Sequence, residues 1–170
     1  LTTDGAGGVI IAWNAGIDLV AQHVNSVGMP QWGLNGVAVP IVGTNPVQVQ
    51  IAADDAGGAI IGWTDSTNIY VQRLNGVGVA QWAATGVALG VAEPVASPET
   101  TPLQLIPDNT GGAMVVWEDF RSGVTDIYAQ RVNNAGAPPL GALRVMVIFL
   151  RSVGEVPWAV RRKSSRRSLS

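Results

Sequence analysis

The sequence predicts an all-β fold made of repeated antiparallel sheets, and two observations support this prediction. The 170 residues include 21 glycines and 10 prolines, and 47% of them are hydrophobic, with recurring Val, Ile and Trp. This composition favours short strands joined by tight turns over long helices. In addition, the pattern Asp-x-x-Gly-Gly begins at Asp4, Asp54 and Asp108, and each copy ends five residues before a tryptophan.

The repeats agree over most of their length. The aligned positions include Trp13, Trp63 and Trp117, followed by Gln22, Gln72 and Gln130. The first two repeats are 50 residues apart throughout. A period near 50 is typical of propeller blades and related arrays. We therefore predict an incomplete β-propeller of three four-stranded antiparallel blades. Because three blades do not close a ring, we expect missing blades or self-association to complete it.

The second repeat shows the four expected strands most clearly. Residues 47–53 alternate between apolar and polar side chains, which is typical of a half-exposed strand. Residues 59–63 are almost continuously apolar, which is typical of a strand covered on both faces. Residues 69–74 alternate again, and residues 86–89 form the fourth strand. A sheet covered on both faces must lie between neighbouring sheets.

Two recurring motifs indicate the hairpins of each repeat. In Asp-x-x-Gly-Gly the aspartate accepts hydrogen bonds from backbone amides two or three residues later, and the first glycine takes a positive φ. We expect this conformation at Gly57 and Gly111. The pattern Asn-x-x-Gly, which begins at Asn25, Asn75 and Asn133, predicts a second hairpin between strands three and four.

The chain divides into three repeats and a tail. The repeats cover about residues 1–43, 44–97 and 98–147, and the third carries Leu140 where a tryptophan is expected. Residues 148–170 form a basic non-repeat tail that we expect to be poorly ordered. The charge is −8 through Leu143 and +6 from Arg144 onward. This abrupt change favours a frame shift or a truncated gene over a nucleic-acid arm, since the tail lacks interleaved aromatic residues. We interpret the chain as a fragment, since it begins within a repeat.

The third repeat resembles those of bacterial secreted or surface β-propellers, which carry a Gly-Gly turn, a tryptophan and the motif DIYAQR. The similar stretch is WEDFRSGVTDIYAQRVNNAG, from Trp117 to Gly136, and the resemblance covers about residues 1–147. The first repeat departs from it, with DLVAQHV in place of DIYAQRV. The resemblance implies an extracellular or cell-surface location. It also implies a non-catalytic module of a larger secreted protein, acting as a scaffold, an adhesion surface or a ligand-binding surface. The competing interpretation is a fragment of a propeller-type, sialidase-like glycan hydrolase.

Length variation locates the candidate ligand-binding residues. The spacing from Trp to Gln grows from 9 to 13 through residues 118–126, and the connection through residues 90–104 lengthens the repeat from 50 to 54. In an antiparallel blade both segments emerge on one rim, where repeat proteins often bind ligands. The candidates on this rim are Asp65, Glu118, Asp119, Arg121 and Asp126. Glycans or other surface proteins are the expected partners.

The acidic candidates have three interpretations. Aspartates in such loops cap turns, which is the interpretation that we favour. Calcium binding is the next, and a carboxylate pair for glycoside hydrolysis is the third. No other cofactor is expected.

The remaining polar and aromatic residues indicate structure more than chemistry. His23 aligns with Arg73 and Arg131, so we interpret it as a substitution on a strand face and expect no catalytic residue. Five of the six tryptophans occupy repeat positions, which favours packing between blades over sugar stacking. The absence of cysteine excludes disulfides and thiolate sites, and no apolar run is long enough to span a membrane.

Overall fold

The computed structural model describes residues 1–41, 45–65, 68–91, 103–119 and 126–138. Within them, all regular structure is β, which confirms the predicted fold class. The strands are β1 (Thr2–Thr3), β2 (Val9–Ala15), β3 (Asp18–Val24), β4 (Val37–Val39), β5 (Val47–Ala53), β6 (Ala59–Thr64), β7 (Asn68–Leu74), β8 (Val87–Val91), β9 (Gln104–Pro107), β10 (Ala113–Asp119) and β11 (Asp126–Val132).

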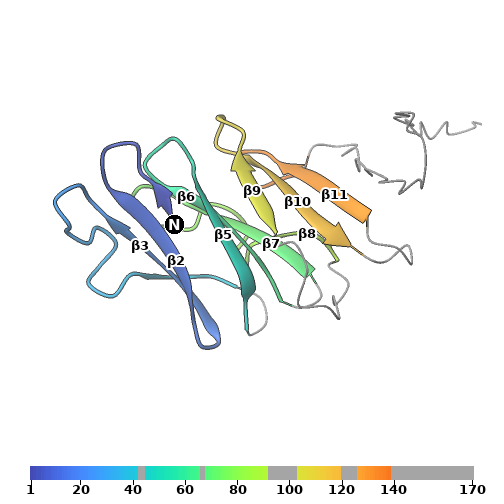
Figure 1. The fold of residues 1–170 in the computed structure, drawn as a ribbon, viewed down its shortest axis with the longest axis horizontal. Helices are drawn as coiled ribbons and strands as arrows, with labels where there is room; N and C mark the ends of the chain where they lie inside the picture. Colours follow the sequence, from blue (N-terminus) through green and yellow to red (C-terminus); the bar gives the residue numbers. More distant parts are fainter. Residues whose placement is uncertain (42–44, 66–67, 92–102, 120–125, 139–170) are drawn as a thin grey trace, which may run out of the picture.

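The strands form three separate antiparallel sheets that follow the order of the chain (Figure 1). The first sheet is β1-β2-β3-β4 and the second is β5-β6-β7-β8. The third contains β9, β10 and β11 in the described part of the chain, and its predicted fourth strand falls almost wholly outside that part. The basic tail, residues 148–170, also lies outside it.

The second sheet lies between the other two, and its strand β6 is buried along its whole length. Ile61 and Trp63 pack with Ile10 and Leu19 of the first sheet in one hydrophobic core. Ile60 belongs to a second core shared with the third sheet. Successive residues of a strand point to opposite faces, so β6 serves both cores. The continuous apolar run in the sequence predicted this strand correctly.

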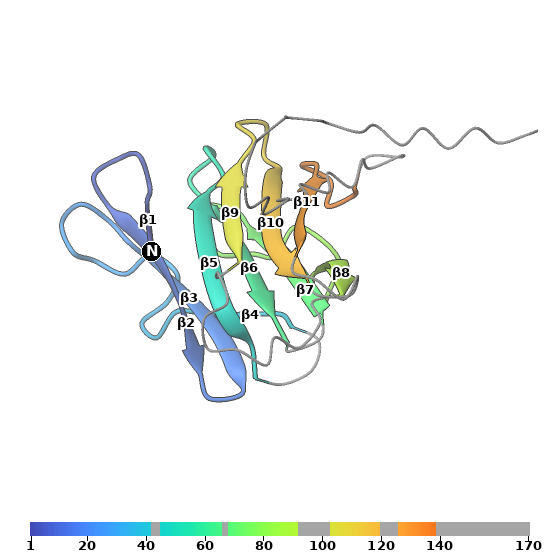
Figure 2. The same cartoon turned by 45° about the vertical axis from the view of Figure 1, so that its right-hand side comes forward.

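The first strands of the sheets come together. β5 contacts both β1 and β9, and β5 and β9 lie side by side in Figure 2. Because every sheet is an antiparallel meander, its turns alternate between two ends. We call the end with the Asp-x-x-Gly-Gly and Asn-x-x-Gly turns the hairpin rim. The opposite end, with the loops between second and third strands and the connections between sheets, is the loop rim.

The backbone of the Asp-x-x-Gly-Gly hairpin explains both of its glycines. The φ angles of Gly57 and Gly111 are 81° and 82°, as predicted. The next glycine is required for a different reason: a Cβ on Gly58 would collide with the carbonyl oxygen of Leu74 on β7. A second left-handed position, which was not predicted, lies at Asp55 and Asn109, whose φ angles are both 58°. Asp and Asn are the non-glycine residues that best tolerate it.

Replacing Gly57 with valine is expected to lower the free energy of unfolding by about 1 kcal/mol or more, because a β-branched residue does not fit the left-handed region. Gly57→Asn is the control, since asparagine tolerates a positive φ and a Cβ here would meet its nearest atom only at 3.9 Å. Urea unfolding of both variants tests this expectation. An equal loss in the two variants would show that the backbone conformation is not the cause.

Candidate functional site

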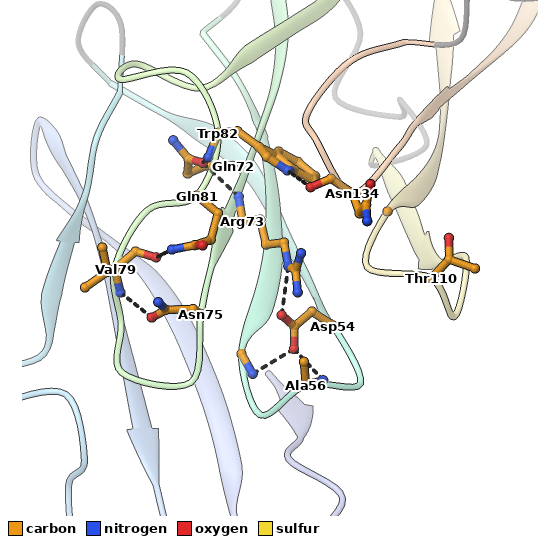
Figure 3. A network of polar contacts seen from close by, with 12 residues as sticks. Asp54, Ala56, Gln72, Arg73, Asn75, Val79, Gln81, Trp82, Thr110 and Asn134 are labelled. Atoms are coloured by element: carbon orange, nitrogen blue, oxygen red, sulfur yellow. Dashed lines mark hydrogen bonds and ion pairs between the residues drawn. The ribbon is translucent and has the colours of Figure 1, made fainter.

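The repeated aspartate joins two elements through its two carboxylate oxygens. In the second sheet, Asp54 Oδ1 accepts hydrogen bonds from the amides of Ala56 at 2.9 Å and Gly58 at 2.7 Å (Figure 3). Its Oδ2 accepts a hydrogen bond from Nε of Arg73 on β7 at 2.9 Å. Asp54 is only 3% exposed. The second amide lies four residues after the aspartate, not three as expected, because it belongs to the second glycine of the motif. The aspartate therefore caps its hairpin and fixes that hairpin to the third strand.

The other two repeats use the same arrangement. In the third sheet, Nε and Nη2 of Arg131 donate to Asp108 Oδ2 at 2.9 and 2.7 Å. In the first sheet, His23 Nε2 lies 2.8 Å from Asp4 Oδ2. His23 thus takes the place of the arginine, as its alignment predicted. The imidazole of His23 is therefore engaged with the aspartate of its own hairpin.

Asp4 in the first sheet and Asp108 in the third are expected to make the stability of the fold sensitive to acid. The hydrogen bond from His23 lowers the pKa of Asp4, and the amide of Ala6 lowers it further. Burial opposes ionisation of Asp108, but hydrogen bonds from Thr110 and Arg131 outweigh it and hold the pKa well below its usual range. Because the folded chain binds protons less readily than the unfolded chain, this stabilisation is present above about pH 4 and is lost as the pH falls through the folded pKa values.

We therefore expect the thermal midpoint to fall between about pH 5 and pH 2. The variant Asp108→Asn is expected to have a lower midpoint at neutral pH and to lose less of it on acidification. Circular dichroism melts across this pH range provide the measurement. Identical acid dependence in both proteins would assign the loss to other carboxyl groups.

The repeated glutamine fixes the segment that carries the next tryptophan. Gln72 Oε1 accepts hydrogen bonds from the amides of Arg73 and Trp82 (Figure 3). Its Nε2 donates to the carbonyl of Ala83 at 2.9 Å. Gln72 is fully buried. The first repeat makes the same three bonds through Gln22. The glutamine is therefore a structural residue in both repeats.

The tryptophans held by these glutamines, Trp32 and Trp82, each form a hydrogen bond with the following sheet. The indole Nε1 of Trp32 donates to the carbonyl of Gly76 in the second sheet at 3.0 Å. The indole Nε1 of Trp82 donates to the carbonyl of Asn134 in the third sheet, also at 3.0 Å (Figure 3). The strand tryptophans Trp63 and Trp117 are buried between sheets. These four confirm the predicted packing role, whereas the fifth, Trp13, is 39% exposed.

On the loop rim, Asp65 is engaged in the turn between β6 and β7. Its Oδ1 accepts a hydrogen bond from the amide of Asn68 at 2.7 Å, and its own amide donates to the Asn68 carbonyl. Burial raises the pKa of the nearby Tyr70 hydroxyl, and the Asp65 carboxylate raises it further. Tyr70 stacks on Trp63 with ring centroids 5.7 Å apart. Asp65 is thus a turn cap that also contacts the edge of the first core.

The other candidates belong to the third sheet. Asp119 and Asp126 are partners in register where β10 ends and β11 begins, next to the pair of Glu118 and Ile127. Glu118 is half-buried. Arg121 lies outside the described residues. The structure therefore places three of the acidic candidates at one end of one hairpin, and Asp65 at the corresponding end of the neighbouring sheet.

The hairpin rim carries an apolar surface that was not predicted from the sequence. Four side chains in the Asn-x-x-Gly turns are more than half exposed: Val27, Met29, Val77 and Val79. Their signal was the recurrence of an apolar residue on either side of the turn glycine, in Asn-x-Val-Gly. A second candidate binding surface therefore lies opposite the predicted one.

Compared with protein-family models, curated proteins and solved structures, the chain shows no match. In the described ranges, no three His, Cys, Asp or Glu side chains are grouped as they would be around a metal ion. Calcium binding on the loop rim stays a prediction. None of the described segments is a helix long and apolar enough to cross a membrane.

Proposed function

We propose that this chain is a non-catalytic repeat module of a larger extracellular or cell-surface protein, serving as a scaffold with a ligand-binding loop rim. The observation that carries the proposal is the use of the recurring residues. Asp54, Gln72 and Trp82, the residue types best suited to chemistry or sugar stacking, are engaged in holding hairpins and joining sheets. What distinguishes one repeat from another is the loop rim, where length and charge vary.

The finer architecture that we propose is a series of successive propeller blades. The sheets are four-stranded in the first two repeats, the middle sheet is covered on both faces, and the first strands of neighbouring sheets are in contact. These features fit blades arranged around a common axis. The extracellular location rests on the resemblance of the third repeat to secreted bacterial propellers.

The proposed role is tested by binding to a glycan panel, to calcium and to candidate surface proteins. The wild type is compared with the triple variant Asp119→Ala, Arg121→Ala, Asp126→Ala. We expect the variant to lose binding with an unchanged unfolding midpoint, because Asp119 and Asp126 lie at the loop-rim ends of their strands and the sequence predicts the same rim for Arg121. The control is Asp55→Asn, which removes a carboxylate from the hairpin rim without disturbing its left-handed backbone.

Binding that survives the triple substitution and is lost on replacing Val77 and Val79 with serine would move the site to the hairpin rim. Release of sugar from a glycoside by the wild type, abolished in the triple variant, would overturn the non-catalytic role.

A further inference from the structure

The first sheet exposes an apolar face whose counterparts in the other sheets are covered. On β2 and β3, Ile10, Ala12, Leu19 and Ala21 belong to the first core. The alternate residues therefore point away from the second sheet. They form what we call the outer face: Val9, Ile11, Trp13, Val20 and Val24. All five are at least partly exposed, and Trp13 reaches 39%.

The same positions are buried wherever a preceding sheet is present. The residues 50 positions later are Ala59, Ile61, Trp63, Tyr70 and Leu74, and every one of them is buried against the first sheet. The corresponding Trp117 of the third sheet is 7% exposed. Exposure of the outer face is therefore not a property of the repeat but of its position in the array.

A second observation concerns the Asn-x-x-Gly turn of each repeat. The indole of Trp32 covers Gly78 so closely that a Cβ there would meet Trp32 Cγ at 2.9 Å, and a Cβ on Gly136 would meet Trp82 Cγ at 2.5 Å. Gly28 has the same left-handed backbone, with φ of 82°, yet a Cβ on it would meet no atom within 4 Å. The first repeat thus has the glycine that an indole requires, and no indole covers it.

The turn around Gly28 already has the geometry of the occupied turns. Asn25 Oδ1 accepts hydrogen bonds from the amides of Val27 and Met29 at 3.1 and 2.9 Å. Asn75 accepts the corresponding bonds at 3.1 and 3.0 Å. The carbonyl of Ser26 therefore occupies the position of the Gly76 carbonyl, which accepts the indole hydrogen bond. We call Ser26 and Gly28 the indole seat.

We infer that the outer face and the indole seat together form a docking face for another four-stranded unit of this repeat, one that carries a tryptophan at the position of Trp32. Such a unit offers both an apolar face and an indole N–H, which are the two groups that the first sheet presents to the second. A second copy of this chain fits less well, because its third repeat has Leu140 at the aligned position and so lacks the donor. The inference rests on the proposed role in a repeat array.

The repeat period provides a direct test. Leu1 aligns with Ile51, so a copy of residues 1–50 placed directly ahead of Leu1 continues the array in register. In this extended chain the added tryptophan is expected to cover Gly28, and the added sheet is expected to cover the outer face. The thermal midpoint should rise by about 3 °C or more, since buried apolar surface is gained.

A single thiol reports coverage of the outer face, because the chain has no cysteine of its own. We expect Ile11→Cys to react with a thiol reagent in the native chain, and roughly tenfold or more slowly in the extended chain, where reaction requires opening of the interface. The control is Leu34→Cys. Leu34 is 89% exposed, and the aligned Ala84 stays exposed although its sheet has neighbours on both sides. This thiol should react equally in both chains.

Two further variants test the indole. Trp32→Ala in the added copy alone should restore much of the reactivity of the Ile11→Cys thiol. Gly28→Asn keeps the left-handed turn, so it should leave the native chain stable, but its side chain should block the added indole and remove the protection. Equal reactivity of the Ile11→Cys thiol in native and extended chains, or full protection without the added indole, would overturn the inference.

Protection in the native chain that grows with protein concentration would also overturn it, by identifying a second copy as the occupant. These outcomes are independent of ligand binding at the loop rim, so failure of docking and failure of the proposed binding role are distinguishable.

Discussion

Replacing Asp54 with alanine is expected to lower the free energy of unfolding by about 3 kcal/mol or more, because the substitution removes one partner of a buried ion pair. The side chain of Asp54 is fully buried, and that of Arg73 is 18% exposed. The variant leaves the guanidinium without its carboxylate, and it also leaves the buried amide of Gly58 without its acceptor. Chemical denaturation of both proteins at neutral pH gives the difference.

Two comparisons separate these contributions. Asp54→Asn keeps an oxygen for the hairpin amides and removes the charge, so its loss should be smaller than that of alanine. Asp108→Ala removes the same contacts in the third sheet, where Arg131 is 45% exposed and water replaces part of the lost interaction. Its loss should be about 1–2 kcal/mol. Equal losses for Asp54→Ala and Asp108→Ala would show that burial does not control the strength of this contact.

The local structure of each repeat was predictable because it depends on neighbouring residues. The apolar run of residues 59–63 gives strand type and burial directly. The alternation of residues 47–53 predicted a strand correctly, but burial does not alternate along it, and its pairing with β6 is interrupted by a register shift between Val47 and Gln50. The turn at Gly57 follows from short-range hydrogen bonds and from the conformational freedom of glycine. These features need no knowledge of what lies across the core.

The contacts between distant residues were not predictable from local patterns. Asp54 and Arg73 meet only once β5, β6 and β7 pair in register, and Trp32 reaches Gly76 only once two sheets have packed. The repeats did contain a signal, since an aspartate, a basic or imidazole side chain, a tryptophan and a turn glycine recur together. Recurrence alone does not say which of these residues touch.

The loop rim was the least predictable region. Its loops differ in length between repeats, so the residues inserted between Asp119 and Asp126 have no aligned position in the other repeats. Asp65 caps its turn through Asn68. In the third repeat, Asp119 precedes and Asp126 follows an insertion that the other repeats lack. The insertion therefore predicts a binding surface that is specific to the third repeat, but it does not identify the ligand.

The tryptophan that joins the first two sheets should show the largest single effect. Trp32→Ala is expected to lower the free energy of unfolding by about 3–5 kcal/mol, as for other buried aromatic residues replaced by alanine. The side chain is 2% exposed, it packs edge-on against His23 at a centroid distance of 5.8 Å, and it donates to the Gly76 carbonyl. The substitution therefore opens a cavity and leaves a carbonyl without its donor.

Trp13→Ala is the matched control for this prediction. It removes the same side chain from the same sheet, but Trp13 is 39% exposed and lies on the outer face, so its loss should be clearly smaller. Trp32→Phe keeps an aromatic ring and removes the N–H, so its loss in free energy of unfolding should lie between those of Trp32→Ala and Trp13→Ala. Hydrogen exchange identifies the region that is destabilised. Amides of the turn from Asn75 to Val79 should lose protection in Trp32→Ala and keep it in Trp13→Ala, because the indole of Trp32 contacts that turn and Trp13 lies on the outer face. Equal destabilisation by the two alanine substitutions would mean that the indole contact does not hold the sheets together, and that apolar burial alone joins them.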